Sequence, residues 1–300
     1  MTLIHVSDEV RETLAAGQPV VALETTLVAH GFPAPQGVEV GLASERRVRD
    51  AGAVPATIGV LDGQIRVGLT EAELHRFTPE ARKCGPRDLA AAAVQGVVGG
   101  TTVGGTVAVA RSVGIRFMGT GGLGGVHRGW PLPPDVSADL GELARTEVLV
   151  VSSGIKSLLD VPSTTELLET LGVPVLGFRT DELPLFYAAR GGPPVSARVE
   201  SAEEAARIAR AHWTLGRAAL VLARPPVESL DDVEPLIERA LTEAAAHGVK
   251  GQAVTPFVLA FLHRESGGRT ERANLELIAD NVALAGEVAV AYAALSSSSQ

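Results

Sequence analysis

The chain has 300 residues, a net charge of −9 and a hydrophobic content of 46%, so its length suits one large domain or two smaller ones. Because it is acidic and has no basic stretch interleaved with aromatic residues, we expect no nucleic-acid partner. The single cysteine, Cys84, excludes an internal disulfide framework and a cysteine-rich metal site. The N-terminus does not resemble a secretory signal and no apolar run approaches a membrane span, so we expect a cytoplasmic protein without membrane contact.

Strand-like and helix-like segments alternate along most of the chain. This alternation predicts βα units around a mainly parallel sheet with helices on both faces, which is a three-layer α/β/α fold. The predicted strands are Val20–Glu24, Thr57–Leu61, Arg116–Gly119, Val148–Ser152, Val173–Phe178 and Ala218–Ala223, and the predicted helices are Val38–Ala51, Arg87–Gly96, Thr164–Leu171 and Ala202–Leu215.

Two features modify this scheme. Asp62-Gly63, between two short apolar runs, predicts a hairpin, so part of the sheet is antiparallel. The last part of the chain is helical in pattern, and no low-complexity linker divides the sequence. We therefore expect a single domain over residues 1–295, followed by a disordered tail, 296–300. The predicted C-terminal helices are Val233–His247, Pro256–Glu265 and Thr270–Leu295.

Lysine is scarce, with three lysines against 23 arginines. An amine can lose its proton and form a Schiff base, whereas guanidinium stays protonated. Lys156 follows the buried-strand pattern Val148–Ser152 and a tight turn, and we expect a helix to begin just after it. This order places the amine at the carboxyl edge of the sheet, where α/β folds bind ligands, and a helix N-terminus would favour its uncharged form. The alternative is a lysine retained by chance with its head in solvent.

The segment Gly119–Gly124 matches the G-x-G-x-x-G pattern of dinucleotide-binding loops. That motif needs a helix directly after it, and the following stretch, rich in glycine and proline, cannot form one. A glycine-rich loop that ends in His127 and Arg128 still suits a single phosphate, bound by backbone N–H groups and two cationic side chains. A purely structural loop remains the alternative.

Acidic residues mark two further positions. Glu24 ends a buried strand, where a carboxylate is costly unless it is paired or protonated, so it is a candidate general acid as well as a candidate ion-pair partner. Ser137 can cap a helix that begins at Ala138, which favours a structural role for Ser137 and Asp139. Asp135 lies outside that helix and is free to bind a hard cation. Lys83, considered alone, is expected to be a solvated charge in a loop.

Taken together, these segments form an ordered set of motifs. The set resembles the pseudouridine-5′-phosphate glycosidase family, which includes indigoidine-synthase-A-like proteins, from about Val20 to Leu295. The motifs are Ala22-Leu23-Glu24-Thr25-Thr26, His30-Gly31-Phe32-Pro33, Arg87-Asp88-Leu89, Thr101-Thr102-Val103, Thr120-Gly121-Gly122-Leu123-Gly124-Gly125-Val126-His127-Arg128-Gly129, Ser137-Ala138-Asp139-Leu140, Gly154-Ile155-Lys156-Ser157 and Val254-Thr255-Pro256-Phe257.

The resemblance implies an enzyme that reversibly cleaves the C–C glycosidic bond of pseudouridine 5′-phosphate, through a lysine Schiff base, into uracil and ribose 5-phosphate. It also implies Lys156 as nucleophile, Glu24 as acid, one Mn²⁺ per subunit on Asp135, and a homotrimer. The substrate-binding candidates are Lys83, Val103, Ser137, Ala138 and Asp139, together with Thr120, His127, Arg128 and Asn281.

The sequence departs from the family pattern in two places. Thr25 stands where serine is common, and Gly85-Pro86 replaces a more usual Ser-Arg beside Lys83. Two other functions stay open on the residues alone. A class I sugar-phosphate aldolase would also use a lysine at a strand end, and a non-catalytic phosphosugar-binding protein would need neither Lys156 nor Glu24.

Overall fold

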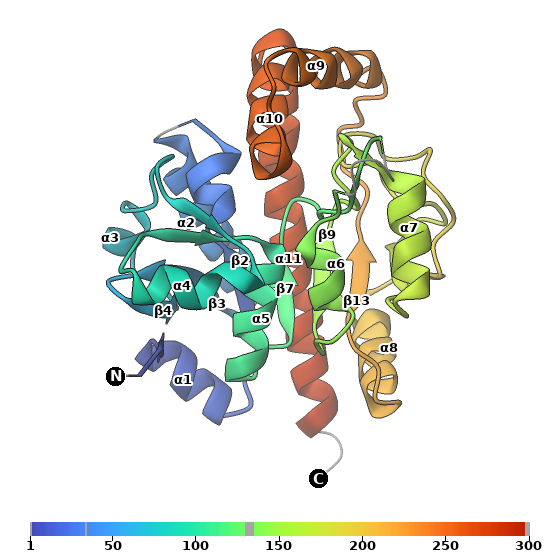
Figure 1. Ribbon diagram of the computed structural model, residues 1–300. Helices are drawn as coiled ribbons and strands as arrows, with labels where there is room; N and C mark the ends of the chain where they lie inside the picture. Colours follow the sequence, from blue (N-terminus) through green and yellow to red (C-terminus); the bar gives the residue numbers. More distant parts are fainter. Residues whose placement is uncertain (1, 34, 130–134, 298–300) are drawn as a thin grey trace.

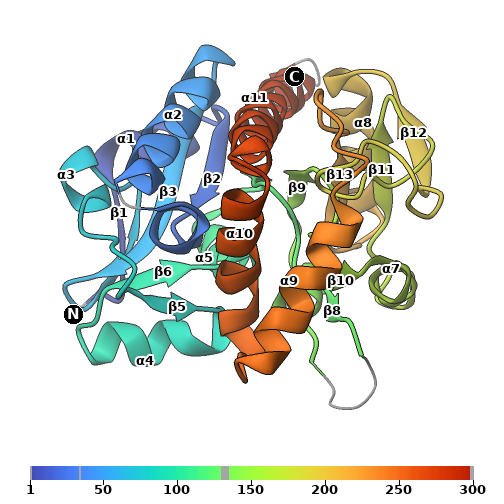
Figure 2. The same cartoon turned by 90° about the horizontal axis from the view of Figure 1, so that it is seen from above.

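A computed structural model describes residues 2–33, 35–129 and 135–297. One mixed sheet runs through the molecule in the strand order β1-β4-β3-β2-β7-β9-β13-β11-β12, with β6 beside β3 and β5 beside β6. Helices cover both faces of this sheet (Figures 1 and 2), which confirms the expected α/β/α layering. The strands are β1 (Ile4–Val6), β2 (Val20–Glu24), β3 (Val54–Leu61), β4 (Gln64–Val67), β5 (Arg82–Cys84), β6 (Gly99–Thr101), β7 (Phe117–Gly119), β9 (Leu149–Ser152), β11 (Val175–Phe178), β12 (Ala197–Val199) and β13 (Leu220–Ala223), while β8 (Val126–His127) and β10 (Leu159–Asp160) form a separate pair.

The centre of the sheet is parallel, from β3 through β2, β7, β9, β13 and β11 to β12. Every residue of β2, β9 and β13 is buried. A parallel sheet covered on both faces requires such continuous apolar strands, and this is why the short apolar runs of the sequence predicted them. The sheet therefore buries its centre and leaves the ends of its strands to form sites.

The expected hairpin is present between β3 and β4. These strands pair antiparallel, and the turn residues Asp62 and Gly63 have φ values of 51° and 75°. A two-residue turn of this kind needs positive φ at both positions, which Asp-Gly accommodates. β6 also pairs antiparallel with β3, so this side of the sheet is mixed as predicted.

Most helices lie in two layers, while α9 and α10 lie beyond the sheet, at the top of Figure 1. α2, α8 and α11 pack together on one face of the sheet, and α5 packs with α6 on the other (Figure 2). The α-helices are α1 (Asp8–Ala15), α2 (Gln36–Asp50), α3 (Glu71–Leu74), α4 (Leu89–Val94), α5 (Val103–Val113), α6 (Ala138–Leu143), α7 (Val161–Thr170), α8 (Ala202–Thr214), α9 (Glu234–Ala246), α10 (Val254–Glu265) and α11 (Arg269–Ser297), and the short ones are the π-helix η1 (Leu27–Gly31) and the 3₁₀ helices η2 (Pro86–Asp88) and η3 (Gly251–Ala253).

α11 is the long central helix of Figure 1. By length and mean hydropathy its segment Arg269–Leu295 could span a membrane, so the expectation that no apolar run approaches that length was wrong here. Half of the apolar window is buried inside the protein, where α11 packs on β2, β7 and β9. Its apolar side chains therefore have partners within the fold. The stretch expected as a tail from Ser296 begins within this helix, and residues 298–300 lie outside the described part.

Candidate active site

The carboxyl ends of β2, β7 and β9 lie side by side, because these strands are parallel neighbours. Glu24 is the last residue of β2, Thr120 directly follows β7, and Lys156 follows β9 on a short loop. Open α/β sheets bind ligands at this edge. The sheet therefore gathers a carboxylate, a hydroxyl and an amine that are far apart in the sequence.

Glu24 is buried, with 9% of its surface exposed. Thr120 Oγ1 donates a hydrogen bond of 2.5 Å to Glu24 Oε1. Burial raises the pKa of Glu24 and Asp139 adds to this rise, while Lys156, the Thr120 hydrogen bond and Lys83 oppose it. A carboxyl group whose protonated form is favoured at a cavity wall suits a general acid.

Lys156 lies across the glycine-rich loop that follows β7. Its backbone N–H donates to Leu123 O (3.2 Å), and a Cβ at Gly122 would lie 3.4 Å from Lys156 Cγ, so the lysine stem passes close over this glycine. The expected helix directly after Lys156 was wrong. The chain first forms β10, which pairs with β8, and α7 begins only at Val161, because the side chain of Asp160 caps it by accepting from Ser163 N (3.0 Å).

Lys83 lies on β5 and is half-buried, so the expectation of a solvated charge was wrong. Burial lowers the pKa of Lys83 to about 8; the neighbouring Lys156 adds to this shift, while Asp139 and Glu24 oppose it. The two lysines therefore share one electrostatic environment with two carboxylates. The Gly85-Pro86 departure directly follows β5: Pro86 opens η2, and Asp88 Oδ2 accepts from Gly85 N (3.0 Å).

The carboxylate of Asp139 joins two loops at the site. Its Oδ1 accepts from Gly104 N at the start of α5 (2.7 Å), and its Oδ2 accepts from Gly124 N in the glycine-rich loop (3.0 Å). Ser137 caps α6 as predicted, with Oγ accepting from Asp139 N (3.2 Å). Val103, the first residue of α5, is buried beside them. After the glycine-rich loop the chain forms β8 rather than a helix, as the argument against a dinucleotide site required.

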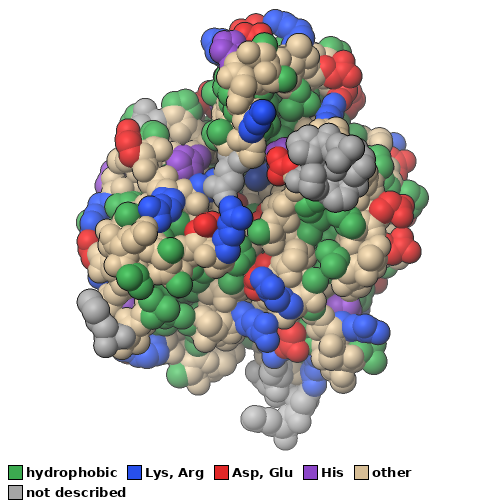
Figure 3. Space-filling model, viewed as in Figure 1, with side chains coloured by type: hydrophobic (Ala, Val, Ile, Leu, Met, Phe, Trp, Pro, Cys, Tyr) green, Lys and Arg blue, Asp and Glu red, His purple; other side chains and the backbone are tan. Residues whose placement is uncertain are grey.

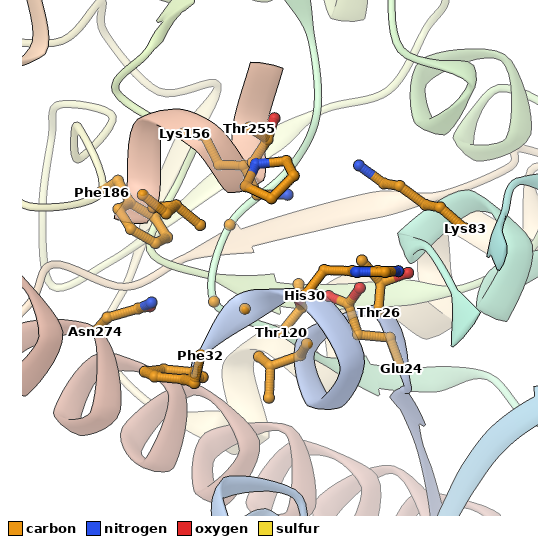
Figure 4. A pocket seen from close by; sticks show the side chains of 16 residues that line it. Glu24, Thr26, His30, Phe32, Lys83, Thr120, Lys156, Phe186, Thr255 and Asn274 are labelled. Atoms are coloured by element: carbon orange, nitrogen blue, oxygen red, sulfur yellow. Dashed lines mark hydrogen bonds between the residues drawn. The ribbon is translucent and has the colours of Figure 1, made fainter. Parts of the chain in front are cut away.

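Two adjoining cavities open at this edge. The polar cavity, of about 360 Å³, is lined by the predicted residues Lys83, Val103, His127, Asp135, Ser137, Ala138 and Asp139. The apolar cavity is lined by Leu27, His30, Phe32, Thr120, Phe186, Pro256, Leu259 and Asn274. Both are lined by Glu24, Thr26, Lys83, Lys156 and Thr255, and Figure 4 shows the lysines and Glu24 beside the apolar cavity.

Asp135 and His127 lie together on the wall of the polar cavity, with His127 Nδ1 3.8 Å from Asp135 Oδ2. Burial lowers the pKa of His127, and Lys83 and Lys156 add to this shift, while Asp135 opposes it. A neutral imidazole is therefore favoured over the expected cation. Within the described ranges, no three His, Cys, Asp or Glu side chains form a group that could hold a metal ion. Asp135 would supply a single carboxylate ligand to a hard cation, and the other ligands would be water and substrate oxygens.

Two predicted substrate-binding residues do not line either cavity. Arg128 is turned toward α9, where Nη1 donates to Glu234 Oε1 (2.7 Å) and Nη2 donates to Ser157 O (2.6 Å). Asn281, on α11, is fully buried behind the glycine-rich loop and hydrogen-bonds to Thr120 O (2.9 Å). The loop motif gave no indication that the Arg128 side chain points away from the site.

Sequence reasoning missed Asn274, which lies on the same helix as Asn281 and lines the apolar cavity. Asn274 is 4% exposed, and its Oδ1 has no hydrogen-bond partner among the described residues; His30 Nε2 is buried in the same condition. Phe186 was missed as well, and its φ of 63° is unusual for a bulky side chain. The signal available in the sequence was the spacing of seven residues between the asparagines, which puts both on one helix face.

The chain is similar to known proteins over almost its whole length. The family model described as "Indigoidine synthase A like protein" matches residues 9–291. The pseudouridine-5′-phosphate glycosidase of Roseiflexus sp. is 50% identical, covering 97% of this chain and 96% of its own, and that of Myxococcus xanthus is 46% identical, covering 97% and 98%.

Two solved structures share the fold. The prealnumycin C-glycosynthase AlnA, in complex with ribulose 5-phosphate, is 39% identical, with a TM-score of 0.89 and 99% of each chain covered. An indigoidine synthase A-like protein from Thermotoga maritima is 38% identical, with a TM-score of 0.86 and 97% of each chain covered. This chain therefore belongs to the indigoidine synthase A like protein family.

Proposed function

We propose that this protein is a pseudouridine-5′-phosphate glycosidase, which reversibly cleaves the C–C glycosidic bond to give uracil and ribose 5-phosphate. The observation that carries the proposal is the pairing of Lys156 with Glu24 on the walls of the same two cavities. The names of full-length relatives that are 46% and 50% identical support it. A C-glycoside has no heteroatom leaving group, so the two-carboxylate hydrolysis of O-glycosides does not suffice.

Lys156 and Glu24 divide the chemistry between them. The bond from C1′ to the ring oxygen breaks as that oxygen takes the proton of Glu24, and the neutral amine of Lys156 bonds to C1′. The Glu24 carboxylate then takes a proton from the new secondary ammonium. When the C1′–C5 bond breaks, its electron pair stays with the base, C5 takes that proton back from Glu24, and the nitrogen lone pair forms the protonated C1′=N imine. Water then adds to the imine, which releases ribose 5-phosphate and the free amine.

The two cavities suit the two parts of this substrate. We assign the sugar phosphate to the polar cavity, where Lys83 offers positive charge. We assign the base to the apolar cavity, where Phe32 and Phe186 give a flat apolar surround and the unpartnered Asn274 Oδ1 is an acceptor for a uracil N–H.

A divalent metal fits beside this phosphate. We propose Mn²⁺ on Asp135, with water and phosphate oxygens as its other ligands. When bound, such an ion would supply positive charge against the phosphate. Asp135 would hold it, and His127, which is favoured as neutral, would serve as a hydrogen-bonding group beside it. Isothermal titration with Mn²⁺ of the wild type and of Asp135→Asn tests this assignment.

We also propose that the protein is a cytoplasmic homotrimer; this rests on the family resemblance alone. Sedimentation equilibrium would give its mass in solution directly.

The test of the function is reductive trapping. With ribose 5-phosphate and borohydride, Lys156 should gain one reduced pentose phosphate, detected by peptide mass spectrometry, and pseudouridine 5′-phosphate should yield uracil. Trapping without release of uracil would favour the sugar-phosphate aldolase instead. Absence of both would leave a phosphosugar-binding protein.

A further inference from the structure

The amide of Asn281 joins the loop after β7, which carries the Glu24 partner Thr120, to the loop after β9, which carries Lys156, although the Asn281 side chain lines neither cavity. Its Nδ2 donates to Thr120 O (2.9 Å) and more weakly to Gly121 O (3.3 Å), on the loop after β7. The same atom also lies 3.1 Å from Ser153 Oγ, on the loop after β9. Asn281 is fully buried, so water cannot replace these contacts.

Each loop leads from Asn281 to one catalytic group. On the first loop, the Thr120 hydroxyl donates to Glu24. The second loop is joined to the first by Ser153 N, which donates to Gly121 O (2.9 Å), and by Lys156 N, which donates to Leu123 O (3.2 Å). The acid Glu24 ends β2, and the nucleophile Lys156 follows β9. The strand between them is β7, and Asn281 binds the loop after β7 and the loop after β9 at the same time.

The close approach of α11 to β7 allows this reach. A Cβ on Gly119 would lie 2.8 Å from Cα of Val282, which directly follows Asn281. Real side chains essentially never tolerate such a contact, so the helix backbone lies against a glycine at the strand end. The helix that carries Asn281 therefore packs directly against the strand end where the loop begins.

We infer that Asn281 is a positioning residue that fixes the acid Glu24 relative to the nucleophile Lys156, and that it acts through Thr120 and Ser153 rather than through contact with the substrate. This inference rests on the proposed function. It replaces the expectation that Asn281 binds substrate with a role that its hydrogen bonds support.

The first test is Asn281→Ala, assayed with pseudouridine 5′-phosphate. Misplacing catalytic groups by about an ångström costs up to about 10²-fold, so kcat should fall by about 10- to 100-fold. KM should change little, because the cavity lining is untouched. A residue that contacts the substrate would instead raise KM, and that result would overturn the inference.

The pH profile gives a reading that a loss of stability alone would not give. Thr120 lowers the pKa of Glu24, so a misplaced Thr120 hydroxyl lets that pKa rise. Since the protonated acid is the active form, the alkaline limb of kcat that belongs to Glu24 should move to higher pH. Val288→Ala is the matched control, because Val288 is a fully buried residue of the same helix. It should lower the melting temperature and leave the limb in place.

A double-mutant cycle completes the test. Thr120→Val removes the hydroxyl that reaches Glu24, so adding Asn281→Ala to it should move the pH limb little further. Full additivity of the two shifts would overturn the route through Thr120.

If Asn281→Ala does not fold, two milder variants that remove part of the hydrogen-bond network, Asn281→Ser and Ser153→Ala, are measured in its place. An unchanged kcat and an unchanged pH limb in both variants would overturn the inference as well. A wild-type protein that releases no uracil refutes the proposed function itself, whereas an active wild type with an unaffected variant refutes only the role of Asn281.

Discussion

The two edges of the sheet both carry cations at a depression, but they use different residues. The carboxyl edge has two lysines, Lys83 and Lys156, together with the exposed Arg87, on the polar cavity of about 360 Å³. The amino edge has a larger depression of about 540 Å³, and its cations are all arginines: Arg111, Arg116, Arg145 and Arg217. In Figure 3, Lys and Arg side chains are spread over the whole face, and several of them lie close together in its lower half.

The arginines of the amino edge lie where helices end. α5, α6, α7 and α8 all end at this depression, where their last carbonyls carry partial negative charge. Arg111 Nη1 donates to Arg145 O (2.9 Å), and Arg145 pairs with the buried Glu142. A permanent cation suits that task, whereas a group that must attack carbon has to lose its proton. The type of cation, rather than the size of the depression, therefore distinguishes the reactive edge.

The largest effect on activity is expected when Lys156, at the carboxyl edge, is replaced by arginine, the cation of the amino edge. Lys156→Arg keeps the charge but removes the nucleophile, so activity should fall by roughly 10⁴-fold or more, as it does when a covalent nucleophile is lost. Borohydride trapping with ribose 5-phosphate should vanish with it. Arg111→Lys makes the reverse exchange at the other edge and should leave kcat/KM unchanged. Trapping that persists in Lys156→Arg would refute the assignment of the nucleophile.

The next effect concerns the acid. General acid catalysis contributes about 10²–10⁴-fold, so Glu24→Gln should lose turnover on that scale. Glutamine is nearly isosteric and still accepts the Thr120 hydrogen bond, so the melting temperature and the affinity for ribose 5-phosphate should persist and serve as controls. A variant that binds normally and turns over at the wild-type rate would show that the proton comes from another group.

A smaller effect concerns the phosphate. A charge-assisted hydrogen bond contributes about 1.5–3 kcal/mol, so Lys83→Met should weaken discrimination between pseudouridine 5′-phosphate and pseudouridine by roughly 10- to 150-fold. The pKa of Lys83 is lowered to about 8, so its cation is present below that pH and is lost above it. The affinity of the wild type for ribose 5-phosphate should therefore fall as the pH rises through about 8. A flat affinity between pH 7 and 9 would remove Lys83 from the phosphate site.

The sequence allowed the carboxyl edge to be predicted better than the amino edge, for a physical reason. Glu24 and Lys156 end or follow continuous apolar runs, and the end of a buried parallel strand is readable from such a run. Arg128 and Asn281 could not be placed, because the direction of an arginine side chain and the choice between two asparagines on one helix face depend on what packs against them. The arginines of the amino edge come from separate helix ends, so their gathering is visible only in three dimensions.

The smallest effect on activity is expected at Arg116, which tests whether the two edges are independent. Its guanidinium lies 5.1 Å from the ring centroid of Trp213, donates to Tyr292 Oη (2.9 Å) and pairs with Glu147 (3.2 Å). Trp213 is buried, whereas Arg116 and Glu147 are partly exposed, so Arg116→Met should cost about 1–2 kcal/mol of the free energy of unfolding. The melting temperature should therefore fall. Arg116→Lys keeps the charge without the planar fork, so its melting temperature should lie between those of the wild type and of Arg116→Met.

Tyr292 belongs to α11, the helix that also carries Asn281. An unchanged kcat/KM in Arg116→Met would show that the contacts of α11 at the carboxyl edge are enough to keep the catalytic groups in place. A fall in kcat at a temperature where the variant is still fully folded would show that the amino edge helps to position those groups.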